Sequence, residues 1–323
     1  MGDVAMTVPV LRAVTDQYPH LKITVVTRAF FLPFFNELNN VEVYSVDLKG
    51  KHKGLLGLYK LSKELKKLRF DAVADLHNVL RSKILKFLFT GTKVVQIDKG
   101  RAEKKALTSR KVFKQLKTTH QRYADVFEAL GYKIELSKPS FPKQKELTSS
   151  LKTFISNPEK KIIGIAPFAA HTSKMYPLDI MEEVIKHLSK DYNIILFGSK
   201  EEVKVLNDLE TKYNTVSSTA GKLNLKEELV IISNLDVMLS MDSANGHLAA
   251  MHGVKVVTIW GVTHPYTGFK PFNQPDDYQL VADRGEFPLI PTSIYGNTYP
   301  ANYENAASSI STKTILEKIK SLA

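Results

Sequence analysis

Residues 237–259 read VMLSMDSANGHLAAMHGVKVVTI and contain the clearest fold signal of the sequence. This stretch opens with an apolar run at Val237–Leu239, continues with a helical pattern over Ala244–His252 and closes with a second apolar run at Lys255–Ile259. Short bounded apolar runs are typical of buried strands, and a helix between two such runs is typical of a parallel crossover. The stretch therefore predicts a β–α–β unit with polar residues where its first strand ends.

The same alternation extends through most of the chain. Strands are predicted at Ile23–Val26, Val41–Val46, Ala72–Ala74, Lys93–Ile97, Lys161–Ala166, Asn193–Phe197, Val237–Leu239 and Lys255–Ile259. Helices are predicted at Val4–Tyr18, Leu55–Leu68, Val79–Phe89, Gln121–Leu130, Leu178–Leu188, Lys200–Lys212, Lys226–Ser233, Ala244–His252 and Ile310–Leu322. Alternating strands and helices indicate an α/β fold, in which helices cover both faces of parallel sheets.

The length of 323 residues suits two domains, since a domain has roughly 100–200 residues. Three prolines and weak periodicity mark Lys138–Pro158 as a linker. We therefore expect Rossmann-like domains over residues 1–150 and 158–323 that face each other across a cleft, with the last helix packing back on the first domain. Met1-Gly2-Asp3 stands where such a domain has its first turn, so its first strand is either absent or lost through a late start.

Composition narrows the function classes. The sequence has no cysteine, which excludes disulfide bonds, thiolate metal sites and a cysteine nucleophile. The histidines are scattered, so no metal site is predicted. The longest apolar stretches, such as Val254–Val262, are too short to span a membrane, and the N-terminus lacks a signal-peptide pattern. These features favour a cytoplasmic protein.

Positive charge is concentrated in one region. The formal net charge is +12, but the stretch from Lys49 to Arg122 holds 21 Lys and Arg against 5 Asp and Glu, and the remaining residues sum to −4. A strongly basic domain favours an anionic partner, which could be nucleic acid, an acidic lipid surface or a phosphorylated sugar. The same residues could equally form solvated helix faces.

Asp3 begins the first predicted helix, and two roles are open to it. As an N-cap, its carboxylate would accept hydrogen bonds from free backbone N–H groups. As a catalytic group at a cleft, it could take a proton from an acceptor hydroxyl.

A loop of small and polar residues follows the strand that ends at Ala166. His171, Thr172, Ser173 and Lys174 supply side-chain donors just before the helix that starts at Leu178. Such a loop beside a helix N-terminus is suited to bind an anion, although the glycines of a Walker P-loop are missing.

A second polar cluster follows Val237–Leu239. Asp242 or Ser243 could cap the next helix, and His247 could be a hydrogen-bonded core residue. Their place at the carboxyl end of a strand is also where open α/β sheets bind ligands. A Ser-His-Asp hydrolase is not favoured, because the Gly-x-Ser-x-Gly pattern is absent.

Taken in order, these elements resemble the ADP-heptose:lipopolysaccharide heptosyltransferases, glycosyltransferase family 9. The resemblance covers nearly the whole chain and rests on Met1-Gly-Asp-Val4 with Pro9, Asp75-Leu-His-Asn-Val-Leu-Arg-Ser82, Lys174-Met-Tyr-Pro177, Phe197-Gly198 with Glu202, Ala220-Gly-Lys222, Asp242-Ser-Ala-Asn-Gly-His-Leu-Ala-Ala250 and Thr263-His-Pro265. It implies a GT-B fold, with the acceptor on the first domain and the nucleotide-sugar on the second. It also implies inverting, metal-independent transfer of heptose from ADP-heptose to the lipopolysaccharide inner core.

The resemblance also assigns roles to individual residues. Asp3 corresponds to the general base, Asp242 to the residue that holds the donor sugar, and Glu202 to the residue that binds the ribose. Donor phosphates would be bound by His171, Thr172, Ser173, Lys174, Ser243, Ala244, Asn245, Gly246 and His247. The acceptor would be bound by His77, Asn78, Arg81 and Ser82. The implied partners are ADP-heptose, the lipopolysaccharide core with lipid A, and an anionic membrane surface at the inner face of the inner membrane, without cofactor or nucleic acid.

The sequence departs from the family pattern in three places. A Pro-Gly-Ala-Ser-like loop reads Pro167-Phe-Ala-Ala170, the Asp-Ser-Gly pattern reads Asp242-Ser-Ala244, and Tyr176 replaces a common tryptophan. Alanine at 244 would change the local geometry if that position required a positive φ. The alternatives to a heptosyltransferase are a GT-B sugar-nucleotide epimerase or hydrolase and, more remotely, a basic nucleic-acid-binding protein.

Overall fold

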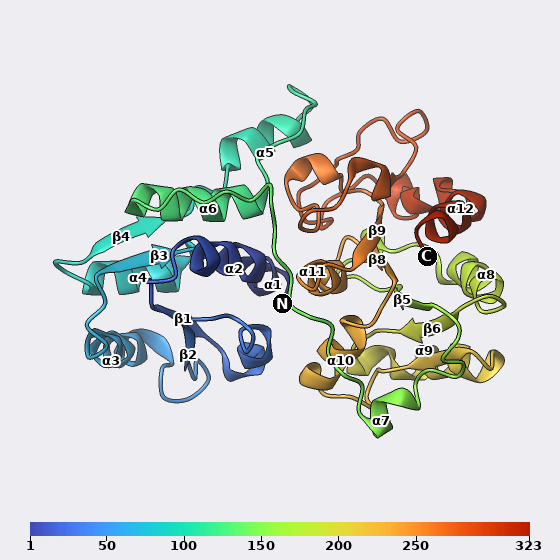
Figure 1. Cartoon of the computed structure of the whole chain (residues 1–323). Coiled ribbons are helices and arrows are strands. Elements are labelled where there is room, and N and C mark those ends of the chain that lie inside the picture. Colours follow the sequence, from blue (N-terminus) through green and yellow to red (C-terminus); the bar gives the residue numbers. More distant parts are fainter. The chain divides into compact units, whose positions relative to one another are not determined.

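A computed structural model describes all 323 residues and divides into two compact units. The first unit consists of Met1, Asp3–Gly100 and Thr119–Ser140 (Figure 1). The second unit consists of Gly2, Arg101–Thr118 and Phe141–Ala323.

This division differs from the predicted domains within the linker and in a segment before it. Residues 141–158 belong to the second unit, where Gln144 Nε2 donates a 3.0 Å hydrogen bond to Asn234 Oδ1. Arg101–Thr118 also belongs to the second unit and brings 7 of the 21 basic residues counted between Lys49 and Arg122. The expectation that a single domain carries the whole basic excess is therefore wrong.

The first unit contains two separate pairs of parallel strands. β1 (Ile23–Thr27) pairs with β2 (Val41–Ser45), and β3 (Ala72–Asp75) pairs with β4 (Lys93–Gln96). Its helices are α1 (Gly2–Ala5), α2 (Thr7–Gln17), the 3₁₀ helix η1 (Ala29–Phe34), α3 (Gly54–Lys66), α4 (Leu80–Leu88) and α6 (Thr119–Leu130). Gly2, the first residue of α1, is grouped with the second unit.

The predicted helix Val4–Tyr18 is interrupted at Met6, between α1 and α2. Pro9 has no N–H to donate to the carbonyl of Ala5, so one bond of a continuous helix cannot form. Thr7 Oγ1 instead donates to the carbonyl of Val4 at 2.7 Å. The break leaves Asp3 in a short helix of its own.

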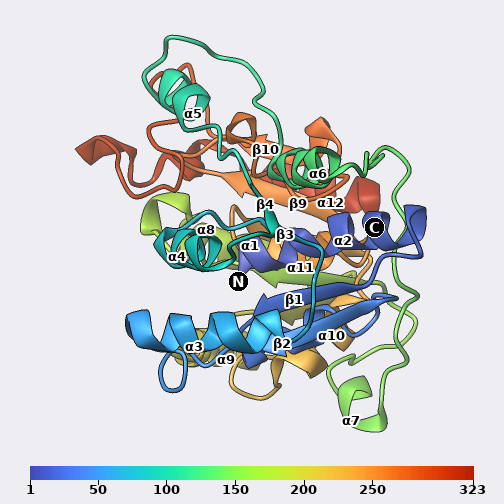
Figure 2. The same ribbon diagram turned by 90° about the vertical axis from the view of Figure 1, so that its left-hand side faces the viewer.

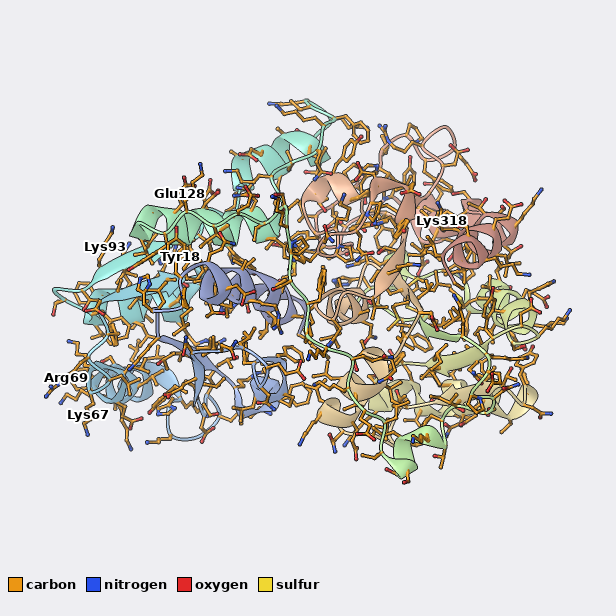
Figure 3. The ribbon with its side chains drawn as sticks, viewed as in Figure 1. Tyr18, Lys67, Arg69, Lys93, Glu128 and Lys318 are labelled. Carbon is orange, nitrogen blue, oxygen red and sulfur yellow. The ribbon has the colours of Figure 1, made fainter.

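Helices α3 and α4 pack side by side over one hydrophobic cluster (Figures 1 and 2). Leu58, Leu61 and Leu65 point into it from α3, and Ile84 and Leu85 join from α4. Just after α3, the side chains of Lys67 and Arg69 extend away from the unit into solvent (Figure 3). Each helix therefore has one face in the core and one face in water.

The second unit is built on a six-stranded parallel sheet in the order β10-β9-β8-β5-β6-β7. Its strands are β5 (Ile162–Ala166), β6 (Asn193–Leu196), β7 (Val216–Ser218), β8 (Val237–Met241), β9 (Lys255–Trp260) and β10 (Gln279–Val281). Numbered from β5, this is the doubly wound order, in which the chain reverses direction across the sheet between β5 and β8. The edge strands β7 and β10, of three residues each, were not predicted.

Helices cover both faces of this sheet, with α8 and α12 on one side and α10 and α11 on the other (Figure 1). The α-helices of the unit are α5 (Arg101–Thr108), α7 (Ser149–Lys152), α8 (Leu178–Leu188), α9 (Val203–Lys212), α10 (Leu225–Ile232), α11 (Ala244–Ala250) and α12 (Thr312–Leu322). Its 3₁₀ helices are η2 (Thr172–Lys174), η3 (Lys200–Glu202), η4 (Pro265–Thr267), η5 (Asp276–Tyr278), η6 (Ala301–Tyr303) and η7 (Ala306–Ser309). Ile315 and Ile319 of α12 are buried in the core of this unit. The last helix thus packs on its own unit.

Glu228 on α10 makes the stability of the second unit depend on pH. Burial raises the pKa of Glu228 to about 7 from 4.5, opposed by a hydrogen bond from Thr219. Because the folded protein holds this proton more tightly, the contribution to stability is complete below pH 4.5 and is lost as the pH rises through 7. We expect Glu228→Gln to stabilise the protein by about 2 kcal/mol at alkaline pH and little at acid pH. Measuring the free energy of unfolding in urea at acid and at alkaline pH tests this prediction.

The control for this experiment is Glu146→Gln, which removes an exposed carboxylate. It should leave the free energy of unfolding unchanged at either pH. A Glu228→Gln variant that is no more stable at alkaline pH than the native protein would contradict the assignment.

Candidate functional site

The carboxyl ends of β5 and β8 mark the point where the strand order of the second unit reverses. Ligands bind at this point in open α/β sheets. Lys174, in the segment after β5, and Asp242, directly after β8, meet here with Nζ 2.8 Å from Oδ2. Thr263 Oγ1 donates to the same carboxylate oxygen at 2.9 Å. The structure thus brings together two of the residues to which the sequence assigned donor binding.

The Lys174–Asp242 pair is mostly shielded from water, with side chains 13% and 9% exposed. The Asp242 carboxylate pairs with Lys174 and accepts a hydrogen bond from Thr263. It does not cap the start of α11. Ser243 is the N-cap residue of α11, but its side chain makes no capping bond and its buried Oγ has no partner. Neither candidate cap occupies the first N–H groups of the helix.

Two small residues shape the start of α11. A Cβ atom on Gly246 would lie 2.6 Å from Ser240 Oγ, so glycine allows the helix to approach the end of β8 closely. Ala244 is the first residue of the helix and does not have a positive φ. The alanine therefore fits this backbone without strain. Asn245 is half-buried and His247 is buried on the same helix.

Most side chains of the polar loop before α8 bond to other residues of the protein. Ser173 is fully buried, and its Oγ donates to the carbonyl of Gly296 at 2.5 Å. Thr172 Oγ1 donates to Glu304 Oε1 at 3.3 Å. His171 is exposed and makes no side-chain bond. Of the four predicted phosphate ligands in this loop, Lys174 pairs with Asp242, and only His171 presents a side chain without a partner.

Sequence reasoning missed the turn that holds Lys174. Gly296 has a φ of +83°, and a Cβ atom there would lie 2.6 Å from Lys174 Cγ and Cδ. Ser293 Oγ closes the turn by accepting from the N–H of Gly296 at 3.0 Å. The Ser293–Gly296 spacing is an ordinary turn signal, but nothing in the sequence relates it to a lysine more than a hundred residues earlier.

Glu202, the predicted ribose-binding residue, lies in the turn after β6. Its Oε2 accepts a 2.5 Å hydrogen bond from the N–H of Ser199 in a reciprocal capping box. One carboxylate oxygen therefore shapes the turn, and Oε1 makes no hydrogen bond within the chain.

Arg101–Thr118 is fastened to the second unit next to Thr263. The Arg284 guanidinium lies 3.6 Å from the centre of the Phe113 ring, which also contacts the ring of His264. Burial, with the charge of Arg284, lowers the pKa of His264 to about 4. His264 is therefore neutral near pH 7, and its Nδ1 accepts from the N–H of Tyr266 at 3.1 Å.

In the first unit, Asp3 has an exposed carboxylate that accepts no hydrogen bond from the chain. The N-cap alternative for Asp3 is therefore wrong. The Tyr123 hydroxyl donates to the backbone carbonyl of Asp3 at 3.3 Å, and burial together with the Asp3 charge raises the pKa of Tyr123. Burial and Lys99 lower the pKa of His77, whereas Asp3 acts in the opposite direction. Asp3 is thus a free carboxylate in electrostatic contact with His77.

The turn after β3 positions the predicted acceptor-binding residues. Asp75 Oδ1 accepts from the N–H groups of His77 and Asn78 at 3.0 and 2.8 Å. Burial raises the pKa of Asp75, but these bonds and one from Gln96 outweigh it and keep that pKa below its usual value. Asn78 adopts a positive φ of 44°, and its Nδ2 donates to the carbonyl of Ile97 at 2.9 Å.

The four predicted acceptor-binding residues therefore divide into two kinds. Asn78 and Ser82 hold the turn, since Ser82 Oγ accepts from the N–H of Val79 at 2.9 Å. His77 and Arg81 have exposed side chains and make no ion pair within the chain.

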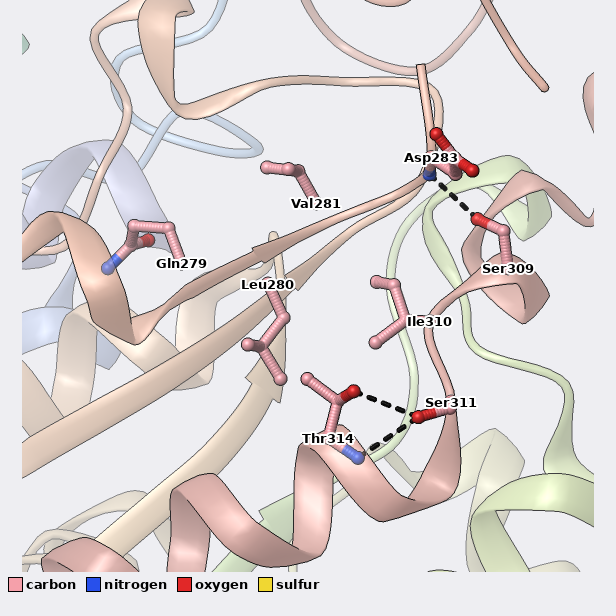
Figure 4. A pocket seen from close by; sticks show the side chains of 8 residues that line it. All are labelled: Gln279, Leu280, Val281, Asp283, Ser309, Ile310, Ser311 and Thr314. Carbon is pink, nitrogen blue, oxygen red and sulfur yellow. Dashed lines mark hydrogen bonds between the residues drawn. The ribbon is translucent and has the colours of Figure 1, made fainter. Parts of the chain in front are cut away.

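A pocket of about 300 Å³ lies elsewhere in the second unit, between β10 and the start of α12 (Figure 4). Its two serines are occupied, because Ser309 Oγ accepts from the N–H of Asp283 and Ser311 Oγ accepts from the N–H of Thr314. None of the predicted site residues lines this pocket, and we assign it no role.

No helix of the structure has the length and apolar character needed to cross a bilayer. The paired α/β units, one with a doubly wound sheet, define a protein of the GT-B class. The chain belongs to glycosyltransferase family 9 (heptosyltransferase), whose family model matches residues 58–286.

Three known proteins illustrate this membership. The chain is 24% identical to the lipopolysaccharide core heptosyltransferase OpsX of Haemophilus influenzae, over 86% of this chain and 80% of that protein. The crystal structure of a family 9 glycosyl transferase from Veillonella parvula aligns with a TM-score of 0.75 and 20% identity, covering 99% of this chain and 94% of that one. The structure of E. coli ADP-heptose lps heptosyltransferase II aligns with a TM-score of 0.68 and 19% identity, covering 99% and 95%.

Proposed function

We propose that this protein transfers heptose from ADP-heptose to a sugar of the lipopolysaccharide inner core, with inversion and without a metal. Family membership and the names of its relatives support the donor and the acceptor class. The observation that carries the proposal is the Lys174–Asp242 pair, braced by Thr263 at the switch point of the six-stranded sheet.

The second unit would bind the donor. When the bond from sugar to diphosphate breaks, negative charge grows on ADP, and Lys174 supplies a fixed cation that stabilises it. The N–H groups at the start of α11, which the side chains of Asp242 and Ser243 leave uncapped, and the free ring of His171 would add donors for the phosphates. Asp242 would accept hydrogen bonds from sugar hydroxyls while Thr263 holds its carboxylate. Glu202 Oε1 would accept hydrogen bonds from the hydroxyls of the ribose.

The first unit would bind the acceptor. Asp3 would take the proton of the attacking hydroxyl, because its carboxylate is exposed and not committed to any backbone donor. His77 and Arg81 would contact carboxylate or phosphate groups of the acceptor, and Asn78 with Ser82 would keep their turn in place. Attack on the face opposite the departing ADP inverts the configuration of the heptose.

Measuring ADP release from ADP-heptose, with and without a truncated lipopolysaccharide core acceptor, tests this function. We expect release that depends on the acceptor and a product heavier than the acceptor by one heptose. Release of ADP or a rearranged sugar with the donor alone would indicate the hydrolase or epimerase alternative. No turnover with either epimer of ADP-heptose would contradict the proposal. Binding to nucleic acid that weakens steeply with salt, without any response to ADP-heptose, would favour the remote alternative.

A further inference from the structure

The four most exposed large apolar side chains of the protein all lie on α3 and α4. Leu56 is 85% exposed, Phe87 83%, Leu80 74% and Leu55 70%, whereas no such side chain elsewhere exceeds 57%. Single exposed apolar residues are common on soluble proteins, but a group of this kind marks an interaction surface.

The helical spacing explains why these side chains are exposed together. Leu80 and Phe87 are seven residues apart on α4, which places them two turns apart on one face. Ile84 and Leu85 of the same helix point into the core cluster, which α3 covers as well. Because the two helices are neighbours over one core, their outer sides form a continuous layer of the unit (Figures 1 and 2). We call this layer the α3–α4 face.

Cations surround the apolar side chains of the α3–α4 face. Apart from Lys51, which pairs with Glu64, the exposed basic residues in and beside the two helices pair with no carboxylate: Lys53, Lys60, Lys63, Lys66, Lys67, Arg69, Arg81, Lys83 and Lys86. Glu64, the only acidic residue in the two helices, is already bound to Lys51, Tyr44 and His52 at 2.8, 2.6 and 3.0 Å. The face therefore carries a positive charge that the protein does not neutralise.

A solvated helix face would account for the lysines but not for the exposed leucines and phenylalanine. Nucleic acid would pair with the cations and leave the aliphatic side chains in water. The interface of an anionic bilayer accounts for both the cations and the exposed apolar side chains. The apolar side chains enter the acyl layer while Lys and Arg remain at the lipid phosphates.

We propose that the α3–α4 face docks the protein on an anionic lipid bilayer, with Leu55, Leu56, Leu80 and Phe87 below the level of the headgroups. This inference concerns binding to the bilayer and needs neither the donor nor the acceptor of the proposed reaction. It places Arg81, a candidate acceptor residue, next to an inserted side chain, which suits an acceptor that is itself anchored in a membrane.

Flotation of the full chain with vesicles tests the docking surface. We expect binding to vesicles of phosphatidylcholine with phosphatidylglycerol, weak binding to phosphatidylcholine alone, and loss of binding at high salt. Leu56→Gln/Phe87→Gln should lower the partition coefficient by at least about tenfold. The control, Phe30→Gln/Tyr295→Gln, removes exposed aromatic residues outside the face and should bind like the native protein.

Fluorescence gives a second measurement that does not depend on the Gln variants. The native chain has a single tryptophan, Trp260, which is fully buried. A Phe87→Trp variant should show a blue shift on anionic vesicles and quenching by brominated lipids, whereas Tyr295→Trp should show neither.

Two results would overturn the proposal. One is native binding to anionic vesicles that the Leu56→Gln/Phe87→Gln variant retains, and the other is no binding beyond that to neutral vesicles. Turnover with a water-soluble acceptor fragment should be the same in the native protein and in this variant. That assay separates failure of the docking surface from failure of the proposed transferase activity.

Discussion

Replacing Asp3 by asparagine is expected to lower kcat for heptose transfer by about 10²–10⁴ while leaving the affinity for ADP unchanged. Asparagine has nearly the shape of aspartate but cannot accept the proton of the acceptor hydroxyl. Because the Asp3 carboxylate makes no hydrogen bond within the chain, its replacement removes no structural contact. The loss should therefore appear in turnover and not in stability.

Steady-state rates of ADP release, calorimetric titration with ADP and urea unfolding together test this prediction. Asp71→Asn is the matched control, since it removes another exposed carboxylate of the first unit. That control should leave all three quantities unchanged. A near-native rate for Asp3→Asn would show that Asp3 is not the base, even if the protein proves to be a transferase.

Most of the sheet of the second unit could be predicted from the sequence because its strands are buried on both faces. β5, β6, β8 and β9 are therefore short apolar runs, and each begins or ends within two residues of its predicted limits. Helix α8 was predicted with its observed bounds, because its apolar residues repeat at helical spacing.

The elements that were missed lack such a signal. α5 has mostly charged and small residues, so its apolar pattern was too weak to identify a helix. The assignment of Arg101–Thr118 to the second unit depends on contacts such as Phe113 with His264, which join residues far apart in the sequence. Spacing along the chain carries no information about such contacts.

In the candidate site, too, some features could be predicted from the sequence and others could not. Lys174 and Asp242 could be predicted because each follows a buried strand, and parallel strands bring their carboxyl ends to one edge. Whether a hydroxyl faces the ligand or the chain depends on its rotamer and on distant neighbours. Ser173 and Thr172 therefore looked like phosphate ligands, yet they bond to Gly296 and Glu304.

Replacing Lys174 by methionine is expected to lower kcat by about 10²–10³, because the departing diphosphate loses a fixed cation. The same change leaves Asp242, which is 9% exposed, with Thr263 as its one remaining side-chain partner. Removing one member of a buried ion pair costs about 3 kcal/mol. Lys174→Met should therefore lower both the rate and the stability. A lower rate alone would not tell whether it comes from the lost cation at the diphosphate or from the lost stability.

The double variant Lys174→Met/Asp242→Asn separates the two effects. Asparagine carries no charge to be left unpaired and can still accept the hydrogen bond from Thr263, so most of the stability should return. The rate should not return, because neither residue then acts on the donor. Lys212→Met breaks the exposed pair with Glu182 and should change stability by less than about 1 kcal/mol, without effect on the rate. If the double variant recovered both stability and rate, Lys174 would be a structural partner of Asp242, and the charge on the leaving group would have to be stabilised elsewhere.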